Sequence, residues 1–160
     1  MSSKLLMIDP ENFVLEGEFE RLIVPEKTIL DEENILAAID QFKTDFVDPG
    51  LAVGELNEGF LIIPTEDGEQ VIEEEKEPAF MIIDIYWDRS RRAICGKLIL
   101  LDTEDGDKVK KEIGQGVECF MSATQTETYT VMDDSNGRML TRISNIKGYK
   151  LSLFKFQNTI

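Results

Sequence analysis

Histidine is absent from the 160 residues of this chain. Imidazole is the usual general base of serine and cysteine hydrolases and a frequent metal ligand, because it titrates near neutral pH. Its absence removes the Ser-His and Cys-His pairs of such enzymes. Only two cysteines are present, so the usual zinc-site spacings are missing as well. We therefore expect no metal and no cofactor.

Cysteines and long apolar runs are also scarce. Cys95 and Cys119 cannot form a disulfide framework, and we interpret both as buried core thiols. The apolar stretch in the first ten residues is short and ends at Asp9-Pro10, unlike a signal peptide or a membrane span. We expect a protein that is made and used in a cytoplasm, with no membrane contact.

Positively charged residues are few. The chain has 17 lysines and arginines against 32 aspartates and glutamates, a formal net charge of −15. Such a chain repels a phosphate backbone, so direct nucleic-acid binding is disfavoured. The acidity fits solubility, a basic protein partner or a crowded, charged compartment, and charge alone does not choose among them.

What the sequence does contain is enough for one folded domain over residues 1–160. Hydrophobic residues make up 42% of it and are spread along its length, so a core can form. Residues 65–78, "TEDGEQVIEEEKEP", are instead polar and very acidic. We interpret this segment as a solvated loop or flap, because adjacent glutamates lack the alternate-position ligands of a calcium loop.

Hydrophobic periodicity predicts two helices. The first has Asp31 as its N-cap and apolar residues at helical spacing up to a stop near residues 48–50. The second, shorter one has Asp102 or Thr103 as its N-cap and ends near Gly114 and Gly116.

Most of the remaining chain has the alternation or the short apolar runs of strands. A central hairpin is predicted from two strongly apolar runs, and Asn136-Gly137 predicts a tight antiparallel turn. Pro64 is expected to end the strand before it. These patterns predict an α+β fold, built as a closed barrel or a packed sheet. The expected strands cover residues 12–24, 51–53, 59–63, 79–87, 93–101, 117–121, 125–132, 138–145 and 148–156.

Four pieces follow one another along the chain: "LEGEFERLIV", "ILAAIDQF", "GLAVGELNEG" and "AICGKLILLDTEDGDKVKKEIGQGVECFMSAT". Their order resembles that in the prohead maturation proteases of tailed bacteriophages, a family related to the herpesvirus assembly proteases. The resemblance extends from about Leu15 to Phe156, and it implies an antiparallel β-barrel-like core with about two flanking helices.

The catalytic positions of that family are largely replaced here. In family members the segment that resembles Gly54-Glu55-Leu56 leads to the catalytic histidine, and Glu58 stands at that position. Ser122 and Ala123 fall on the family's serine pair, and Thr124 falls on its arginine. The Asn-Gly-Arg signature that often precedes the first helix is absent as well. Ser122 is left as the candidate nucleophile.

A serine hydroxyl attacks an amide only when a base accepts its proton. An unperturbed glutamate, with a pKa of about 4.3, is a weak base at pH 7. Our first hypothesis is therefore a catalytically inactive relative that serves as a structural or assembly protein of the virion head, whether capsid-associated, inner-head, vertex or neck. The alternative is an active serine endopeptidase that pairs Ser122 with Glu58 or another carboxylate.

Simpler interpretations of the same residues remain open. "GELNEG" also fits an ordinary turn, Ser122 also fits a surface serine, and an unrelated acidic β-rich accessory protein is a third possibility. If the ancestry is right, Glu58 and Ser122 should approach each other on neighbouring strands. The resemblance also implies capsid or other virion proteins as partners, or self-association. It implies a location in the phage head, with assembly in the host cytoplasm.

Overall fold

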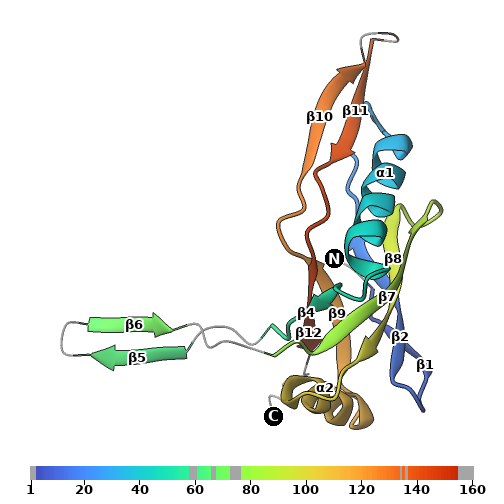
Figure 1. Cartoon of the computed structure of the whole chain (residues 1–160). Coiled ribbons are helices and arrows are strands. Elements are labelled where there is room, and N and C mark those ends of the chain that lie inside the picture. The colour runs from blue at the N-terminus through green and yellow to red at the C-terminus, as the bar shows by residue number, and fades with distance from the viewer. Residues whose placement is uncertain are drawn as a thin grey trace, which may run out of the picture.

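A computed structural model of the chain describes residues 3–57, 61–65, 68–72, 77–133, 135 and 137–154. Its elements are mixed: two α-helices and a π-helical turn accompany strands that are nearly all antiparallel. The exception is one parallel pair at the far end of the molecule. The predicted α+β class with about two helices is therefore confirmed (Figure 1).

A five-stranded sheet forms the body, in the order β1-β2-β8-β7-β4. The predicted central hairpin is confirmed as β7 and β8, which pair antiparallel. Strand β1 has no counterpart in the sequence prediction. The strands are β1 (Leu6–Asp9), β2 (Val14–Arg21), β4 (Val53–Gly54), β7 (Phe80–Asp88) and β8 (Ala93–Leu100).

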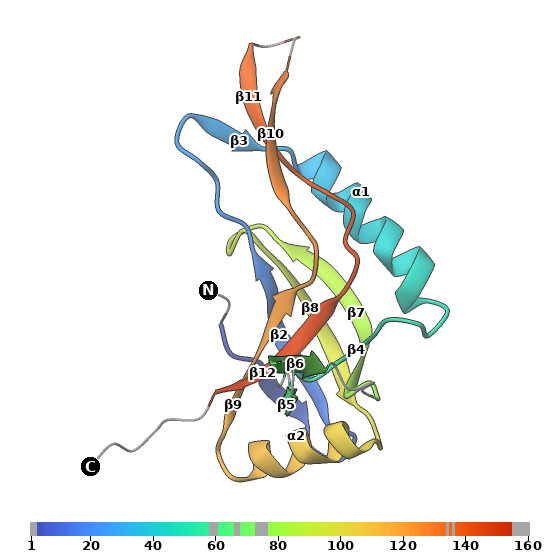
Figure 2. The same cartoon turned by 90° about the vertical axis from the view of Figure 1, so that its left-hand side faces the viewer.

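Two smaller sheets continue the molecule. Strands β9 (Glu118–Ala123) and β12 (Tyr149–Phe154) pair antiparallel beside the body. Strands β10 (Thr128–Asp133) and β11 (Arg138–Ile143) form the predicted hairpin, which extends away from the body as an arm (Figures 1 and 2). Strand β3 (Thr28–Leu30) adds to β11 in parallel and was not predicted.

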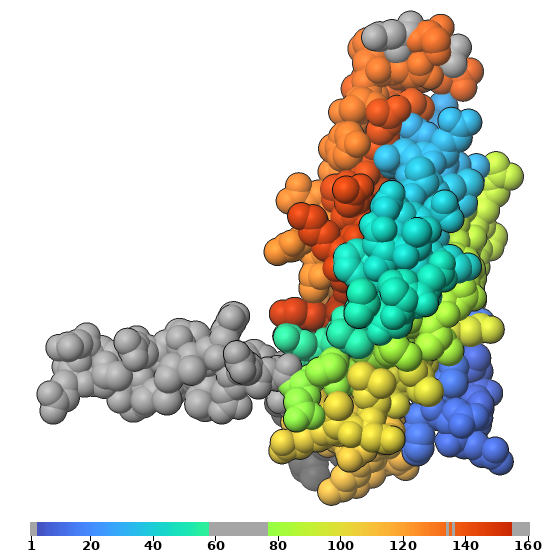
Figure 3. Space-filling model, in the orientation of Figure 1, coloured from blue at the N-terminus to red at the C-terminus, as the bar shows by residue number. Residues whose placement is uncertain are grey.

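Both helices begin at capping residues that the sequence identifies. Helix α1 (Glu32–Phe42) starts after Asp31, whose side chain accepts a hydrogen bond from the Asn34 amide at 3.2 Å. It packs one apolar face on the core and crosses the body between the arm and β7 (Figure 3). A π-helical turn, η1 (Lys43–Val47), follows it. Helix α2 (Glu104–Gly114) is capped by Thr103, so the Asp102 alternative is wrong.

The core lies between the two groups of strands. Cys95 and Cys119 are both buried and unbridged, as predicted. Strands β2 and β9 run close together but form no ladder, so the described strands do not close into a barrel. The largest side chains that are completely enclosed are Phe19, Phe80, Leu15, Ile35, Leu56, Ile85, Ile94, Leu98, Ile143 and Leu151.

Strands β5 (Leu61–Thr65) and β6 (Gly68–Ile72) pair only with each other among the described strands, and their hairpin stands to one side in Figure 1. One expectation is wrong here. Pro64 lies inside β5 rather than after it, which an antiparallel pair tolerates where the missing N–H faces away from its partner. Part of the acidic segment 65–78, for which a loop or a flap was expected, forms β6, and the interpretation as a flap stays a prediction.

Candidate functional site

Ser122 lies on the outer face of the small sheet formed by β9 and β12. Along β9, Cys119 and Met121 are buried whereas Ser122 is exposed, as expected from the period of two in a strand. Its partner across the ladder is Lys150 of β12. Ser122 is therefore accessible, on a strand held in place by a buried inner face.

The other half of the candidate motif meets the same sheet from the opposite side of β12. The Asn57 amide donates to the Leu151 carbonyl at 2.8 Å, and the Leu151 amide donates to the Glu55 carbonyl at 3.0 Å. These two bonds form a parallel bridge between Leu56 and Leu151. Strand β12 thus lies between the "GELN" segment and β9, so the segment before the family histidine position is held two strands away from Ser122.

Glu58 itself lies outside the described residues. Its expected approach to Ser122 therefore stays a prediction, although Asn57 is placed directly beside β12. The other two family-equivalent positions follow Ser122. Ala123 packs partly against the core, and the Thr124 amide donates to the Gly148 carbonyl at 2.9 Å.

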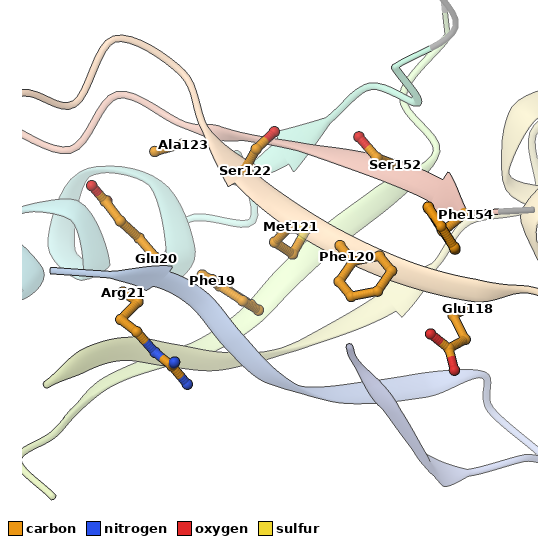
Figure 4. Close-up of a pocket in the computed structure, with 10 residues that line it drawn as sticks. All are labelled: Phe19, Glu20, Arg21, Glu118, Phe120, Met121, Ser122, Ala123, Ser152 and Phe154. Carbon is orange, nitrogen blue, oxygen red and sulfur yellow. The ribbon is translucent and has the colours of Figure 1, made fainter. Parts of the chain in front are cut away.

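A groove with a volume of about 600 Å³ runs along β9 next to Ser122. One wall comes from β2 and the other from β9 and β12, so the groove occupies the place where the barrel is open (Figure 4). Most of its surface is apolar, with the Ser122 and Ser152 hydroxyls at its margin. The lining residues are Phe19, Glu20, Arg21, Glu118, Phe120, Met121, Ser122, Ala123, Ser152 and Phe154.

Glu20 is a titratable lining residue that the sequence analysis did not single out. The register of β2 against β8 shifts between Glu18 and Glu20, which leaves Phe19 as an extra residue. Such a bulge breaks the alternation of a strand. As a result Glu18 and Phe19 are both buried, and Glu20 also turns into partly buried surroundings. A strict period of two does not predict this arrangement.

Burial raises the pKa of Glu20 to about 7, and the nearby Tyr149 hydroxyl only partly opposes the shift. No hydrogen bond of good geometry joins the two groups, since Glu20 Oε1 and Tyr149 Oη are both buried without a hydrogen-bond partner. Burial, and to a smaller extent the nearby Glu20 carboxylate, raises the pKa of the Tyr149 hydroxyl. Glu20 is therefore a carboxyl group that changes charge near neutral pH.

Neighbouring Glu18 has the opposite character. Burial alone would raise its pKa, but a 2.7 Å hydrogen bond from Arg21 and the Ser3 amide bring it below the ordinary value. Glu18 is thus a compensated structural anion. Glu20, two residues along, has no cation to compensate it among the described contacts.

Ser122 and Glu20 line the same groove, but they are not joined. No described residue forms a hydrogen bond with Ser122 Oγ. In Figure 4 the Ser122 hydroxyl and the Glu20 carboxyl point in different directions. The groove therefore holds a candidate nucleophile and a candidate base without the contact that activates one by the other.

Metal sites and membrane-spanning helices were also sought in the described part of the chain. It contains no cluster of three or more cysteine, aspartate or glutamate side chains arranged to hold a metal ion. Neither of its helices has the length and apolar content needed to cross a membrane.

Comparison with known proteins gives a result at the level of three-dimensional structure. The capsid assembly protease of bacteriophage T4 is similar to this chain with a TM-score of 0.53 over 95% of this chain and 90% of that one. The chain has a prohead-protease-like fold. The sequence identity is 16%, so the likeness concerns the fold. No protein-family profile and no curated protein sequence matches.

With this fold in place, the outcome for the candidate residues can be stated. The structure describes Ser122, Ala123 and Thr124 on and just after β9, and it brings the segment before Glu58 into the adjoining sheet. It adds Glu20 and Tyr149, which the sequence analysis did not identify. In the sequence "EFER" two glutamates flank a phenylalanine, and either of them could lie in a groove. Only the bulge in β2 shows that Glu20 is the one that lines it.

Proposed function

We propose that this protein is a catalytically inactive relative of the prohead proteases and serves as a structural or assembly protein of the phage head. The observation that carries the proposal is a prohead-protease-like fold in a chain without histidine, in which none of the described residues forms a hydrogen bond with the Ser122 hydroxyl. The head component would be capsid-associated, inner-head, vertex or neck.

The size of the missing catalytic contribution supports an inactive protein. General base catalysis contributes roughly 10²- to 10⁴-fold, and the same group must return the proton to the leaving amine. A carboxylate of ordinary pKa supplies little of this at pH 7. Loss of the base together with the family arginine leaves a fold that can bind but turns over very slowly.

The partners proposed are capsid or other virion proteins, with self-association as a further possibility. The similar structure is named as a capsid assembly protease, so a capsid surface is the natural partner to propose for a related fold. The net charge of −15 favours a basic protein surface over nucleic acid. Location in the head and assembly in the host cytoplasm follow from the same proposal.

One observation favours a second candidate, an active serine endopeptidase. A pKa of about 7 for Glu20 is suited to a general base near neutral pH, and Glu20 shares the groove with Ser122. Catalysis would require the carboxylate to come within about 2.6–3.2 Å of the Ser122 hydroxyl, directly or through one water. Glu20 would then take the role that the sequence assigns to Glu58.

The two candidates differ in the mass of the purified protein over time. Full-length wild type and Ser122→Ala are incubated between pH 5 and pH 8, and intact mass is followed for days. The proposal predicts identical, unfragmented spectra. Fragments that form in wild type and not in Ser122→Ala would overturn it, and comparison of Glu20→Gln with Glu58→Gln would then identify the base.

A further inference from the structure

The turn between β7 and β8, residues 89–92, concentrates positive charge in a chain whose net charge is −15. Three of its four residues are exposed arginines, namely Arg89, Arg91 and Arg92. The Arg91 amide donates to the Asp88 carboxylate at 3.2 Å, and the Leu22 amide donates to the Arg92 carbonyl at 2.9 Å. This arginine turn is therefore held in a defined place at one end of the hairpin.

The charges of the arginine turn are only partly compensated. Arg89 donates to both carboxylate oxygens of Glu32 at 2.8 Å, and Arg91 lies 3.6 Å from Asp88. Among the described residues, none forms an ion pair with Arg92. The guanidinium of Arg89 also keeps N–H groups beyond the two that Glu32 accepts. The turn can therefore donate to further carboxylates.

A hollow with a volume of about 450 Å³ lies beside Arg89 and Arg92. Its walls include the apolar side chains of Val24, Ile29 and Trp87. Tryptophan and arginine are enriched among the residues that carry most of the binding energy at protein interfaces. The hollow and the turn together suit a peptide that has carboxylates next to apolar residues, because guanidinium groups form strong hydrogen bonds with carboxylates.

One stretch of this chain has that composition. Residues 71–77 read "VIEEEKE", so two apolar residues precede a run of four glutamates and one lysine. The last residue of this acidic run (residues 73–77), Glu77, is exposed. Two residues later the chain is anchored, because the Ala79 amide donates to the Gly54 carbonyl at 2.8 Å.

The acidic run and the arginine turn adjoin opposite ends of β7 (Figure 1). A strand of this length spans about 30 Å, whereas the five residues of the run span at most about 17 Å when fully extended. Because Ala79 holds the end of the run at the start of β7, a single copy cannot lay its run on its own arginine turn. Contact between the run and the turn therefore joins two copies.

We propose that the acidic run of one copy binds the arginine turn of a second copy, with its glutamates on Arg89 and Arg92 and the preceding apolar residues in the hollow. The contact deepens the self-association named in the proposed function, and it rests on that function for a setting in which copies are crowded together. The two surfaces differ and adjoin opposite ends of β7, so an antiparallel pair or a head-to-tail row of copies satisfies the contact.

Sedimentation velocity of the full-length protein over a range of concentrations tests the arginine turn. Arg92→Gln should lower the association constant at least about tenfold, as for a lost hydrogen bond to a charged group. Arg138→Gln is the matched control, since it removes the same exposed positive charge from the arm. It should change the association constant less than about threefold, so an effect of net charge alone is excluded.

Two further variants test both halves of the contact. The turn variant combines Arg89→Gln with Arg92→Gln and keeps the acidic run. The run variant keeps the arginine turn and carries Glu73→Gln, Glu74→Gln, Glu75→Gln and Glu77→Gln. Each alone should sediment as a monomer where wild type associates, although the run variant is less negative and so repels itself less. An equimolar mixture should form a one-to-one complex, because the run of the first binds the turn of the second.

Three results would each overturn the proposal. They are a wild type that stays monomeric up to about 1 mM, an Arg92→Gln variant that associates as tightly as Arg138→Gln, and a mixture that forms no complex. These measurements need no virion. Their failure is therefore distinguishable from a failure of the head-protein proposal, which has its own test.

Discussion

Glu18 and Glu20 lie on the same strand, two residues apart, and have opposite electrostatic surroundings. Glu18 is enclosed but receives hydrogen bonds from Arg21 and the Ser3 amide, and its pKa is lowered. Glu20 is desolvated without a cation, and its pKa is raised to about 7. The bulge at Phe19 produces this difference, and the alternation of the sequence alone does not contain it.

The raised pKa of Glu20 has a consequence for stability. Between about pH 4.5 and pH 7 the folded state retains a proton that the unfolded state has lost, so the contribution of Glu20 to stability declines as pH rises. Glu20→Gln removes this dependence. We expect the variant to match wild type near pH 4 and to exceed it by up to roughly 3 kcal/mol at pH 8.

Urea unfolding of both proteins across this pH range measures the effect. Taking the difference between the two proteins cancels the titration of the other carboxylates. A difference in unfolding free energy that stays constant with pH would contradict the assigned surroundings of Glu20.

At the scale of elements, the "GELN" segment is placed by close packing. An added Cβ at Gly54 would lie 2.2 Å from the Phe80 ring and 2.5 Å from the Tyr149 carbonyl oxygen. Gly54 therefore permits β4 to approach both β7 and β12, and the next three residues then reach Leu151. The glycine of this segment has a structural role that is independent of catalysis.

Replacement of Gly54 tests this packing. Gly54→Ala should lower the free energy of unfolding by roughly 1–3 kcal/mol or more, because backbone as well as ring atoms must move. Gly114→Ala is the matched control, since nothing lies within 4 Å of its added Cβ and helix α2 gains a better helix former. Thermal unfolding of the two variants should separate them, and equal midpoints would contradict the close approach.

The sequence predicts elements whose signals are local. The caps Asp31 and Thr103, the β7–β8 hairpin and the pairing of β10 with β11 are all confirmed, because each depends on a few neighbouring residues. Strand β1 was missed although its partner, β2, is the next strand in the sequence. Strand β3 was missed because its partner in the ladder, β11, lies far along the chain. The bulge in β2 depends on tertiary packing in the same way, which is why Glu20 was not foreseen.

At the scale of the whole molecule, the prohead-protease-like fold is present, whereas the histidine expected at the candidate site is absent. Strand β12 lies between the "GELN" segment and β9, so the segment before Glu58 and the strand that carries Ser122 are held by the same strand. The histidine is not present anywhere in the chain. Resemblance in the order of motifs could predict the fold, since it depends on many positions, whereas activity depends on a few side chains at the site.

Intact-mass spectrometry of purified phage particles tests the central claim most directly. An inactive structural or assembly protein of the head should be present in the particles as one unfragmented chain, at a reproducible number of copies per particle. Absence of the chain from the particles, or its presence only as fragments that disappear when Ser122 is changed to alanine, would contradict the account.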